Sequence, residues 1–210
     1  MSGIGFLSIP DQTAEAQSLF DDDVSELGYV MNSSRLWAYQ PGTVTGIFDL
    51  TREATSANRL SVRQRGILVS ACASTLGDSY CSLAWGSKLA HVSDAQTASG
   101  VLRGQDDALS PAELAMAVWA RKVARDPNRT SAADVQELRD AGFSDSQIFA
   151  ITVFVALRIA FSTVNDALGV CPDAALRSTA PQEVLDAVTF GRPIDNSVET
   201  TARSDDFGEL

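Results

Sequence analysis

The sequence predicts an all-α protein. Four segments begin with a capping-box pattern, in which a hydroxyl residue is followed three positions later by Glu or Gln. Within these segments, apolar residues recur at intervals of three and four, as one face of a helix requires. Strand signals are weak, because the β-branched run GTVTGIF at residues 42–48 is short and continues into helix-like sequence.

The predicted helix starts share one chemistry. The hydroxyl group accepts a bond from a backbone N–H of the first turn, and the Glu or Gln side chain accepts a bond from the N-cap N–H. In order along the chain, the pairs are Ser61 with Gln64, Ser110 with Glu113, Ser144 with Gln147, and Thr179 with Gln182. Pro111 follows one of these caps, at the first helical position, where its missing N–H costs nothing.

The predicted helix ends are marked by glycine, which adopts the left-handed conformation at a C-cap without strain. These glycines are Gly28, Gly77, Gly142, Gly169 and Gly191. After Gly77, either Asp78 or Ser79 can cap a further helix that extends to His91. The segment 144–169 is apolar on nearly every side and is expected to be central and buried.

The domain organisation follows from the spacing of these elements. The loops are short and no linker separates two units, so residues 1–192 are expected to form a single helical domain. Residues 193–210 are polar and acidic with little to bury. We expect this tail to be flexible, or ordered only against a partner chain.

The composition limits the class of function. The chain of 210 residues carries a formal net charge of -11, which argues against binding to nucleic acid or to an anionic membrane surface. The most apolar run, at residues 148–161, contains Arg158 and is too short to span a bilayer. The N-terminus does not resemble a signal peptide, so a cytoplasmic location is expected.

Cysteine and histidine usage limits the chemistry further. The three cysteines, Cys72, Cys81 and Cys171, do not form a disulfide framework and fit a reducing compartment. A single histidine and scattered cysteines predict no metal site, and no motif indicates an organic cofactor. Cys72 and Cys171 are interpreted as core residues, because free cysteine is among the most buried residue types.

Cys81 is the candidate catalytic residue. It lies in the first turn of the helix predicted from residue 79, where the helix dipole and free N–H groups favour the thiolate. Helical spacing places Asp78, Trp85 and Lys88 on the same face as Cys81. His91 lies off this face and about three turns away, so it is not expected to serve as a base. The alternative is that Cys81 only fills the core.

Three long segments together resemble a known family. LSVRQRGILVSACASTLGDSYCSLAWGSKLA at residues 60–90 is similar to the core motif of the carboxymuconolactone decarboxylase and alkyl hydroperoxidase D (AhpD) superfamily. Residues 6–54 and 121–170 resemble the flanking segments of its peroxidase-related subgroup. The resemblance implies an AhpD-like helical bundle and a homo-oligomer, which could be a dimer, a trimer or a hexamer.

The resemblance also implies a dithiol chemistry, from which this sequence departs. In active members, one cysteine of a CxxC motif attacks peroxide and the other resolves the sulfenic acid, while a glutamate and a histidine relay the proton. Here Asp78 occupies the first cysteine position and Cys81 the second, with Tyr80 retained between them. Gly66 stands at the glutamate position and Trp85 at the histidine position. In the closing motif, Ser162 and Thr163 replace an Asn-Arg pair.

Three functions remain open from the sequence. The first is an antioxidant, peroxidase-related protein that reduces hydroperoxides through Cys81 alone, with an external thiol as reductant. The second is altered chemistry on, or binding of, a small organic acid or lactone, with Asp78, Trp85 and Lys88 lining the site. The third is an inactive oligomeric interaction protein. A Cys81 sulfur enclosed by aliphatic side chains, without access to water, would exclude the first.

Overall fold

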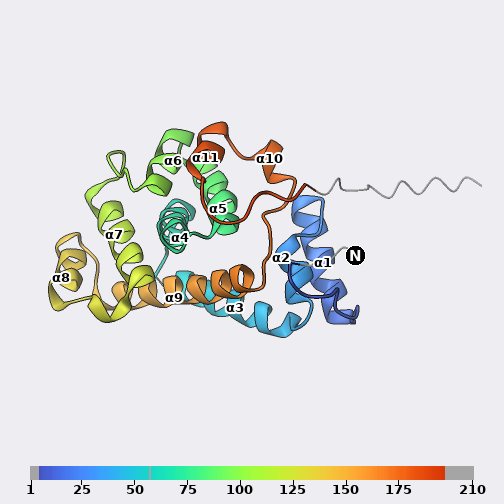
Figure 1. Ribbon diagram of the computed structural model, residues 1–210. Helices are drawn as coiled ribbons and strands as arrows, with labels where there is room; N and C mark the ends of the chain where they lie inside the picture. The colour runs from blue at the N-terminus through green and yellow to red at the C-terminus, as the bar shows by residue number, and fades with distance from the viewer. Residues whose placement is uncertain (1–4, 57, 197–210) are drawn as a thin grey trace, which may run out of the picture.

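A computed structural model of the chain describes residues 5–56 and 58–196, and it is helical throughout these ranges apart from turns and loops (Figure 1). The helices are α1 (Ala14–Leu27), α2 (Asn32–Trp37), α3 (Pro41–Ser56), α4 (Val62–Leu76), α5 (Ser79–Val92), α6 (Ala95–Arg103), α7 (Pro111–Arg125), the 3-10 turn η1 (Pro127–Arg129), α8 (Ala132–Asp140), α9 (Asp145–Ala167), α10 (Leu176–Thr179) and α11 (Gln182–Ala187). The all-α prediction is confirmed, and the β-branched run at 42–48 lies inside α3.

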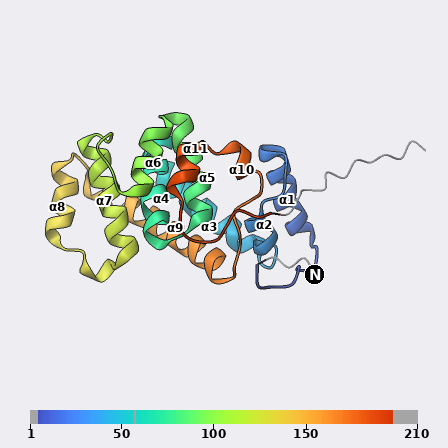
Figure 2. The same cartoon turned by 45° about the horizontal axis from the view of Figure 1, so that its top comes forward.

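The core of the fold is built around α4, which is seen end-on near the centre of Figure 1. All eight residues from Gly66 to Ala73 of this helix are buried. Helices α5, α6, α7 and α9 pack against it, and α3 lies along α9. Figure 2 shows the same arrangement from another side, with α8 at one end of the molecule and α1 and α2 at the other. The helix that carries Cys81 therefore lies directly against the central one.

Three of the four predicted capping boxes are confirmed. Ser61, Ser110 and Ser144 each make both reciprocal bonds with the residue three positions on. The fourth prediction is wrong: α11 begins at Gln182 without a side-chain cap, and the preceding residues form the separate short helix α10. Thr179 is instead the last residue of α10, and Pro181, which has no backbone N–H to donate, is the N-cap of α11.

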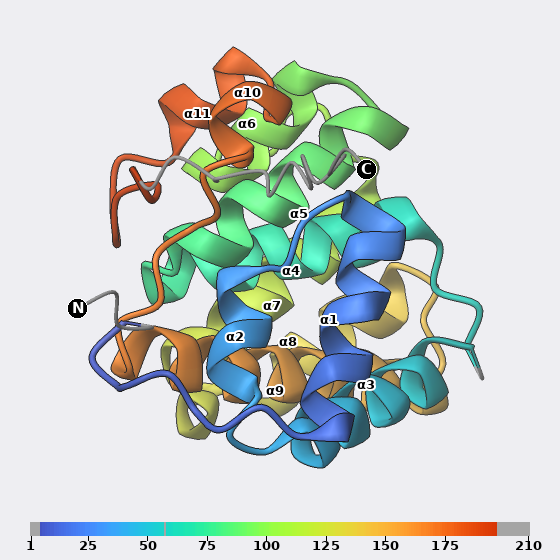
Figure 3. The same cartoon turned by 90° about the vertical axis from the view of Figure 1, so that its right-hand side faces the viewer.

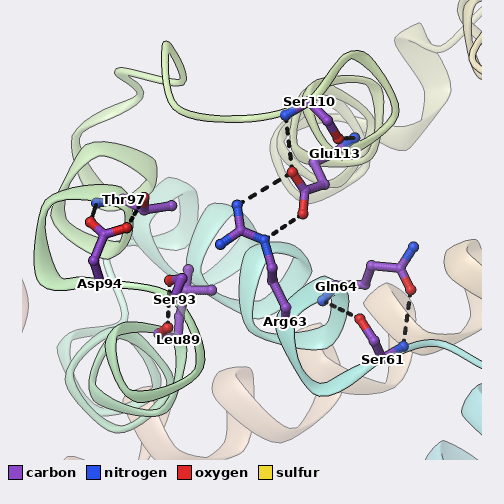
Figure 4. Close-up of polar contacts among 9 residues, drawn as sticks. All are labelled: Ser61, Arg63, Gln64, Leu89, Ser93, Asp94, Thr97, Ser110 and Glu113. Atoms are coloured by element: carbon purple, nitrogen blue, oxygen red, sulfur yellow. Dashed lines mark hydrogen bonds and ion pairs between the residues drawn. The ribbon is translucent and has the colours of Figure 1, made fainter.

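The ends of α4, α5, α6 and α7 meet in a set of polar contacts, drawn in Figure 4. Arg63 Nε of α4 donates to Glu113 Oε1 of α7 at 2.6 Å. Glu113 also accepts a bond from the Ser110 backbone N–H, so one carboxylate both caps α7 and ties it to α4. These bonds hold the pKa of Glu113 below its ordinary value. The close α4–α7 contact thus combines an apolar face with an ion pair at its edge.

Helix α9 has a strongly apolar sequence. Its 23 residues are long and apolar enough to cross a membrane by length and composition alone. The helix extends beyond the apolar run at 148–161 at both ends, so the expectation that no segment is long enough to span a bilayer was wrong. In the fold, however, α9 packs against α3, α4, α7 and α8 and buries the Arg158 side chain, as a core helix of a bundle does.

The chain after α11 runs back over the bundle as an extended segment. We call residues 188–196 the C-terminal strap, and Figures 1 and 2 show it in red, crossing the end of α5. Figure 3 shows α1 and α2 lying side by side over one face of the central helices. Of the tail predicted from residue 193, the first four residues belong to this strap and the rest lies outside the described residues.

Candidate functional site

The start of α5 positions the two candidate catalytic residues. Asp78 is the N-cap of α5, and its Oδ1 accepts a hydrogen bond from the Cys81 backbone N–H at 2.9 Å. Cys81 therefore lies in the first turn, as predicted. Of the two capping residues considered, Asp78 is the one used, and its side chain is completely buried. This is unusual for an aspartate, because a buried carboxylate needs partners to offset its lost hydration.

The Cys81 sulfur is enclosed, yet two polar side chains of α9 point at it. Arg158 Nη2 donates to Cys81 Sγ at 3.3 Å, and Ser162 Oγ donates to it at 3.7 Å. Cys81 is 2% exposed and Arg158 is 5% exposed. The sulfur thus lacks direct access to water but faces a guanidinium and a hydroxyl group rather than aliphatic side chains alone.

The electrostatics of this site favour the neutral thiol. Burial raises the pKa of Cys81 far above its ordinary value, and the negative charge of Asp78 raises it further. The positive charge of Arg158 acts in the opposite direction, as does the Ser162 hydrogen bond, but neither outweighs burial. The thiol of Cys81 is therefore protonated at neutral pH in this closed structure. The expectation that the helix dipole would favour the thiolate gives way to desolvation here.

Arg158 is a buried cation held mainly by aromatic rings. Its Cζ lies 5.5 Å from the ring centroid of Trp85 and 5.0 Å from that of Phe161. Within residues 5–56 and 58–196 it forms no ion pair, and its Nε has no hydrogen-bond partner. Such a guanidinium is costly to bury without an anion. The Cys81 sulfur is one group in contact with Arg158 that becomes an anion when it loses a proton.

Trp85 and Lys88 lie at the outer edge of the same cluster. Lys88 Nζ is 5.1 Å from the Trp85 ring centroid, so the indole is in contact with both the exposed Lys88 and the buried Arg158. The structure thus brings together four residues of the predicted site, Asp78, Cys81, Trp85 and Lys88, on one face of α5, with Arg158 as the central cation.

Tyr80 and Gly66 are directed elsewhere. Tyr80 Oη donates to Asp173 Oδ2 at 2.5 Å and contacts Ser33 Oγ at 3.1 Å, so its hydroxyl ties α5 to α2 and to the segment after α9. A Cβ built on Gly66 would lie 3.1 Å from Leu89 Cβ, two turns along α5 from Cys81. Both residues have structural roles in this arrangement and neither contacts the sulfur.

The Tyr80 hydroxyl predicts a loss of stability. Tyr80→Phe removes a donor from the buried Asp173 carboxylate, and we expect it to lower the free energy of unfolding by about 1–3 kcal/mol. Tyr39→Phe is the matched control, because the Tyr39 hydroxyl donates to Ser8 O at an exposed position. Urea unfolding followed by circular dichroism measures both variants. Equal losses in the two would contradict the role assigned to the Asp173 contact.

The other sulfur and imidazole groups lie away from this cluster or are inert. Cys72 is 1% exposed in the core, and burial raises its pKa to about 12, so the core interpretation is confirmed. Cys171 is only partly buried, less than predicted. His91 lies exposed in the last turn of α5.

The sequence reasoning missed the α9 side of the site. In the sequence, Arg158 is a single charge within an apolar run, and Ser162 is a replacement in the closing motif. A single arginine in 14 otherwise apolar or hydroxyl residues, at 148–161, is the signal that could have pointed to a buried partner. Asn165, one further helical turn along, accepts a bond from Trp37 Nε1 at 2.9 Å and completes the polar stripe.

Comparison with known proteins gives similarity in structure but not in sequence. No protein-family model matches the chain, and no curated protein matches it. Among solved structures, an uncharacterized peroxidase-related protein from Silicibacter sp. TM1040 superimposes with a TM-score of 0.76 at 21% identity, covering 85% of this chain and 96% of that one. An AhpD-core, peroxidase-related protein from Ralstonia eutropha JMP134 gives 0.75 at 20% identity, covering 84% and 96%.

A third similar structure has a named activity. The debrominase Bmp8, in a variant with one cysteine replaced by alanine and in complex with 2,3,4-tribromopyrrole, gives a TM-score of 0.66 at 17% identity, covering 86% of this chain and 96% of that one. In all three, almost the whole solved chain is matched. The chain described here therefore has the all-α, AhpD-like fold of the peroxidase-related proteins.

Proposed function

We propose that the protein is a peroxidase-related member of the AhpD-like superfamily that reduces hydroperoxides through the single thiol Cys81. The contact between Arg158 Nη2 and Cys81 Sγ is the observation that carries this proposal. A guanidinium beside a cysteine stabilises the thiolate, which is the nucleophilic form. Ser162 adds a second donor to the same sulfur.

The reaction has a balanced course with one cysteine. The Cys81 thiolate attacks the terminal oxygen of the hydroperoxide, so that an S–O bond forms, the O–O bond breaks and an alcohol leaves after taking up a proton. The sulfur is oxidised to a sulfenic acid. Asp78 cannot resolve it, so an external thiol condenses with the sulfenic acid, releasing water, and a second external thiol reduces the mixed disulfide.

The closed site sets the pH dependence of this chemistry. Because burial and Asp78 raise the pKa of Cys81, only a small fraction of the protein carries the thiolate at neutral pH. The rate of peroxide consumption should therefore increase steadily from pH 7 to pH 10 without levelling off. A plateau below pH 8 would indicate a thiolate that is already formed, which this geometry does not support.

The direct test replaces two of the three cysteines, one at a time. Peroxide consumption is measured with dithiothreitol as the reductant, and Cys81→Ser is expected to abolish the protein-dependent rate. Cys171→Ser is the matched control, because Cys171 is the partly exposed cysteine and lies outside the site. Its rate should equal that of the wild type. Equal rates for the wild type and Cys81→Ser would refute the proposal.

A second candidate function is chemistry on a small organic molecule. The observation in its favour is the shared fold with a debrominase that binds 2,3,4-tribromopyrrole, together with the aromatic and cationic groups Trp85, Lys88 and Arg158 beside Asp78. Organic acids, lactones and halogenated pyrroles would be screened by thermal shift. A compound that stabilises the wild type and Asp94→Asn, a variant at a remote N-cap, but does not stabilise Asp78→Asn would favour this function over peroxide reduction.

The third candidate is an inactive protein that acts through its surface. The 2% exposure of Cys81 favours it, since an inert cysteine is buried in this way. The peroxide assay distinguishes this candidate from the first, because Cys81→Ser would then consume peroxide at the same rate as the wild type. For all three functions we propose a homo-oligomer in the cytoplasm, and sedimentation of the full chain gives the number of subunits.

A further inference from the structure

The strap at residues 188–196 is bound to both helices that enclose Cys81. Ser79 Oγ, in the first turn of α5, donates to the Arg192 backbone oxygen at 2.8 Å. The guanidinium of the same residue donates through Nη2 to the Asp166 backbone oxygen of α9 at 2.9 Å. Arg192 therefore connects the first turn of α5, where Cys81 lies, to the last turn of α9, the helix that also contains Arg158 and Ser162.

The neighbouring glycine fits this position because it lacks a side chain. Gly191 has a φ of +72°, and a Cβ added to it would lie 2.6 Å from Gly77 O and 2.7 Å from Ser79 Oγ. The sequence analysis assigned Gly191 to a helix end, but α11 ends at Ala187, four residues earlier. Its conformation instead lets the strap lie in backbone contact with the turn between α4 and α5.

Further contacts fix the strap on either side of this point. Arg192 Cζ lies 4.7 Å from the Phe6 ring centroid, and the Asp195 backbone N–H donates to Pro172 O at 2.8 Å. The strap also lines an open pocket of about 560 Å³, together with Leu83, Arg177 and Leu185. The strap is thus held by a few polar contacts and by the partly buried Val188 and Ile194, beside an open pocket. Segments with few buried contacts open at low cost in free energy.

We propose that the strap is a clasp that closes the α5–α9 interface over Asp78 and Cys81, and that its release admits small reagents to the sulfur. The proposal rests on the proposed function for its biological meaning, since a thiol enzyme needs such access, but access itself is measurable without any enzymatic activity. Asp78 is completely buried and directly precedes Ser79, whose hydroxyl binds the strap. In this proposal the clasp keeps water away from Asp78.

The test measures how fast each cysteine reacts with methyl methanethiosulfonate in the folded full chain, by mass spectrometry of the modified peptides. Gly191→Ala forces the strap away from Gly77 and Ser79, and we expect Cys81 to react at least about fivefold faster. Gly104→Ala is the matched control, because Gly104 has a similar φ of +73° but nothing within 4 Å of an added Cβ. Its Cys81 rate should equal that of the wild type.

Cys72 separates local opening from general unfolding. It is 1% exposed in α4 and reacts only when the core opens. Release of the clasp should therefore accelerate Cys81 without accelerating Cys72. A parallel increase in both, or a Gly191→Ala rate equal to that of Gly104→Ala, overturns the proposal.

A second variant covers the case in which Gly191→Ala does not fold. Arg192→Met removes the guanidinium bond to α9 and keeps the backbone oxygen that Ser79 uses, and it should also accelerate Cys81 selectively. An unchanged rate in Arg192→Met then overturns the clasp. Peroxide consumption is measured beside it: faster alkylation with no peroxide reduction supports the clasp and refutes the proposed function.

Discussion

Asp78→Asn is expected to make Cys81 react with alkylating agents about tenfold faster at pH 8. The negative charge of Asp78 raises the pKa of the thiol, and a hydrogen bond to the carboxylate further stabilises the neutral form. The amide removes the charge but keeps an oxygen that can accept the bond from the Cys81 backbone N–H, so α5 stays capped. One pKa unit corresponds to a tenfold change in the fraction of thiolate.

The control for this variant is the same change at another helix start. Asp94 is the exposed N-cap of α6. It accepts a bond from the Thr97 backbone N–H at 2.7 Å, which is drawn in Figure 4. Asp94→Asn should leave the alkylation rate of Cys81 unchanged. The rates are measured from pH 7 to pH 10, and an Asp78→Asn curve that superimposes on the wild type would show that the carboxylate does not govern the thiol.

Arg158→Met is expected to have the opposite effect, slowing the alkylation of Cys81 about tenfold at pH 8. The positive charge of Arg158 lowers the pKa of the thiol, so its removal raises that pKa further. Methionine fills a similar apolar volume between Trp85 and Phe161 without a charge. The same loss should appear in peroxide consumption if the proposed function holds.

Arg158→Lys separates charge from geometry. Lysine keeps the positive charge but has no planar fork to lie between two rings while donating to Sγ. We expect an alkylation rate between those of Arg158→Met and the wild type, together with a pH profile displaced less than that of Arg158→Met. If Arg158→Met reacts as fast as the wild type at every pH, the guanidinium does not stabilise the thiolate, and the main support for the peroxidase proposal is lost.

The helices could be predicted where their signals are local. Ser61, Ser110 and Ser144 begin α4, α7 and α9 because the capping bonds join residues only three positions apart. The same reasoning failed after residue 170, where the chain forms two short helices and an extended strap. Their course is determined by contacts with distant parts of the chain, such as Ser79 with Arg192, and no local pattern records these.

Only the part of the site that lies on α5 could be predicted from the sequence. Asp78, Cys81, Trp85 and Lys88 share a face of α5, which follows from helical spacing. Arg158 lies 77 positions from Cys81 in the sequence, so periodicity could not show that the two side chains meet. The burial of Cys81 could not be predicted either. The sequence shows that Cys81 lies at a helix start, but the desolvation of its thiol depends on how α5, α9 and the strap pack together.

The close approach of Gly66 to Leu89 restricts which side chains position 66 can accept without a shift of its neighbours. The family resemblance implies a glutamate at position 66, but here a Cβ would already lie 3.1 Å from Leu89 Cβ. A side chain at position 66 therefore requires Leu89 to shift by a few tenths of an ångström, because both its Cβ and its Cδ1 lie within 3.2 Å of the added atom. Glycine at this position lets α4 and α5 pack at their present separation, and a glutamate there would act first on the packing of these two helices.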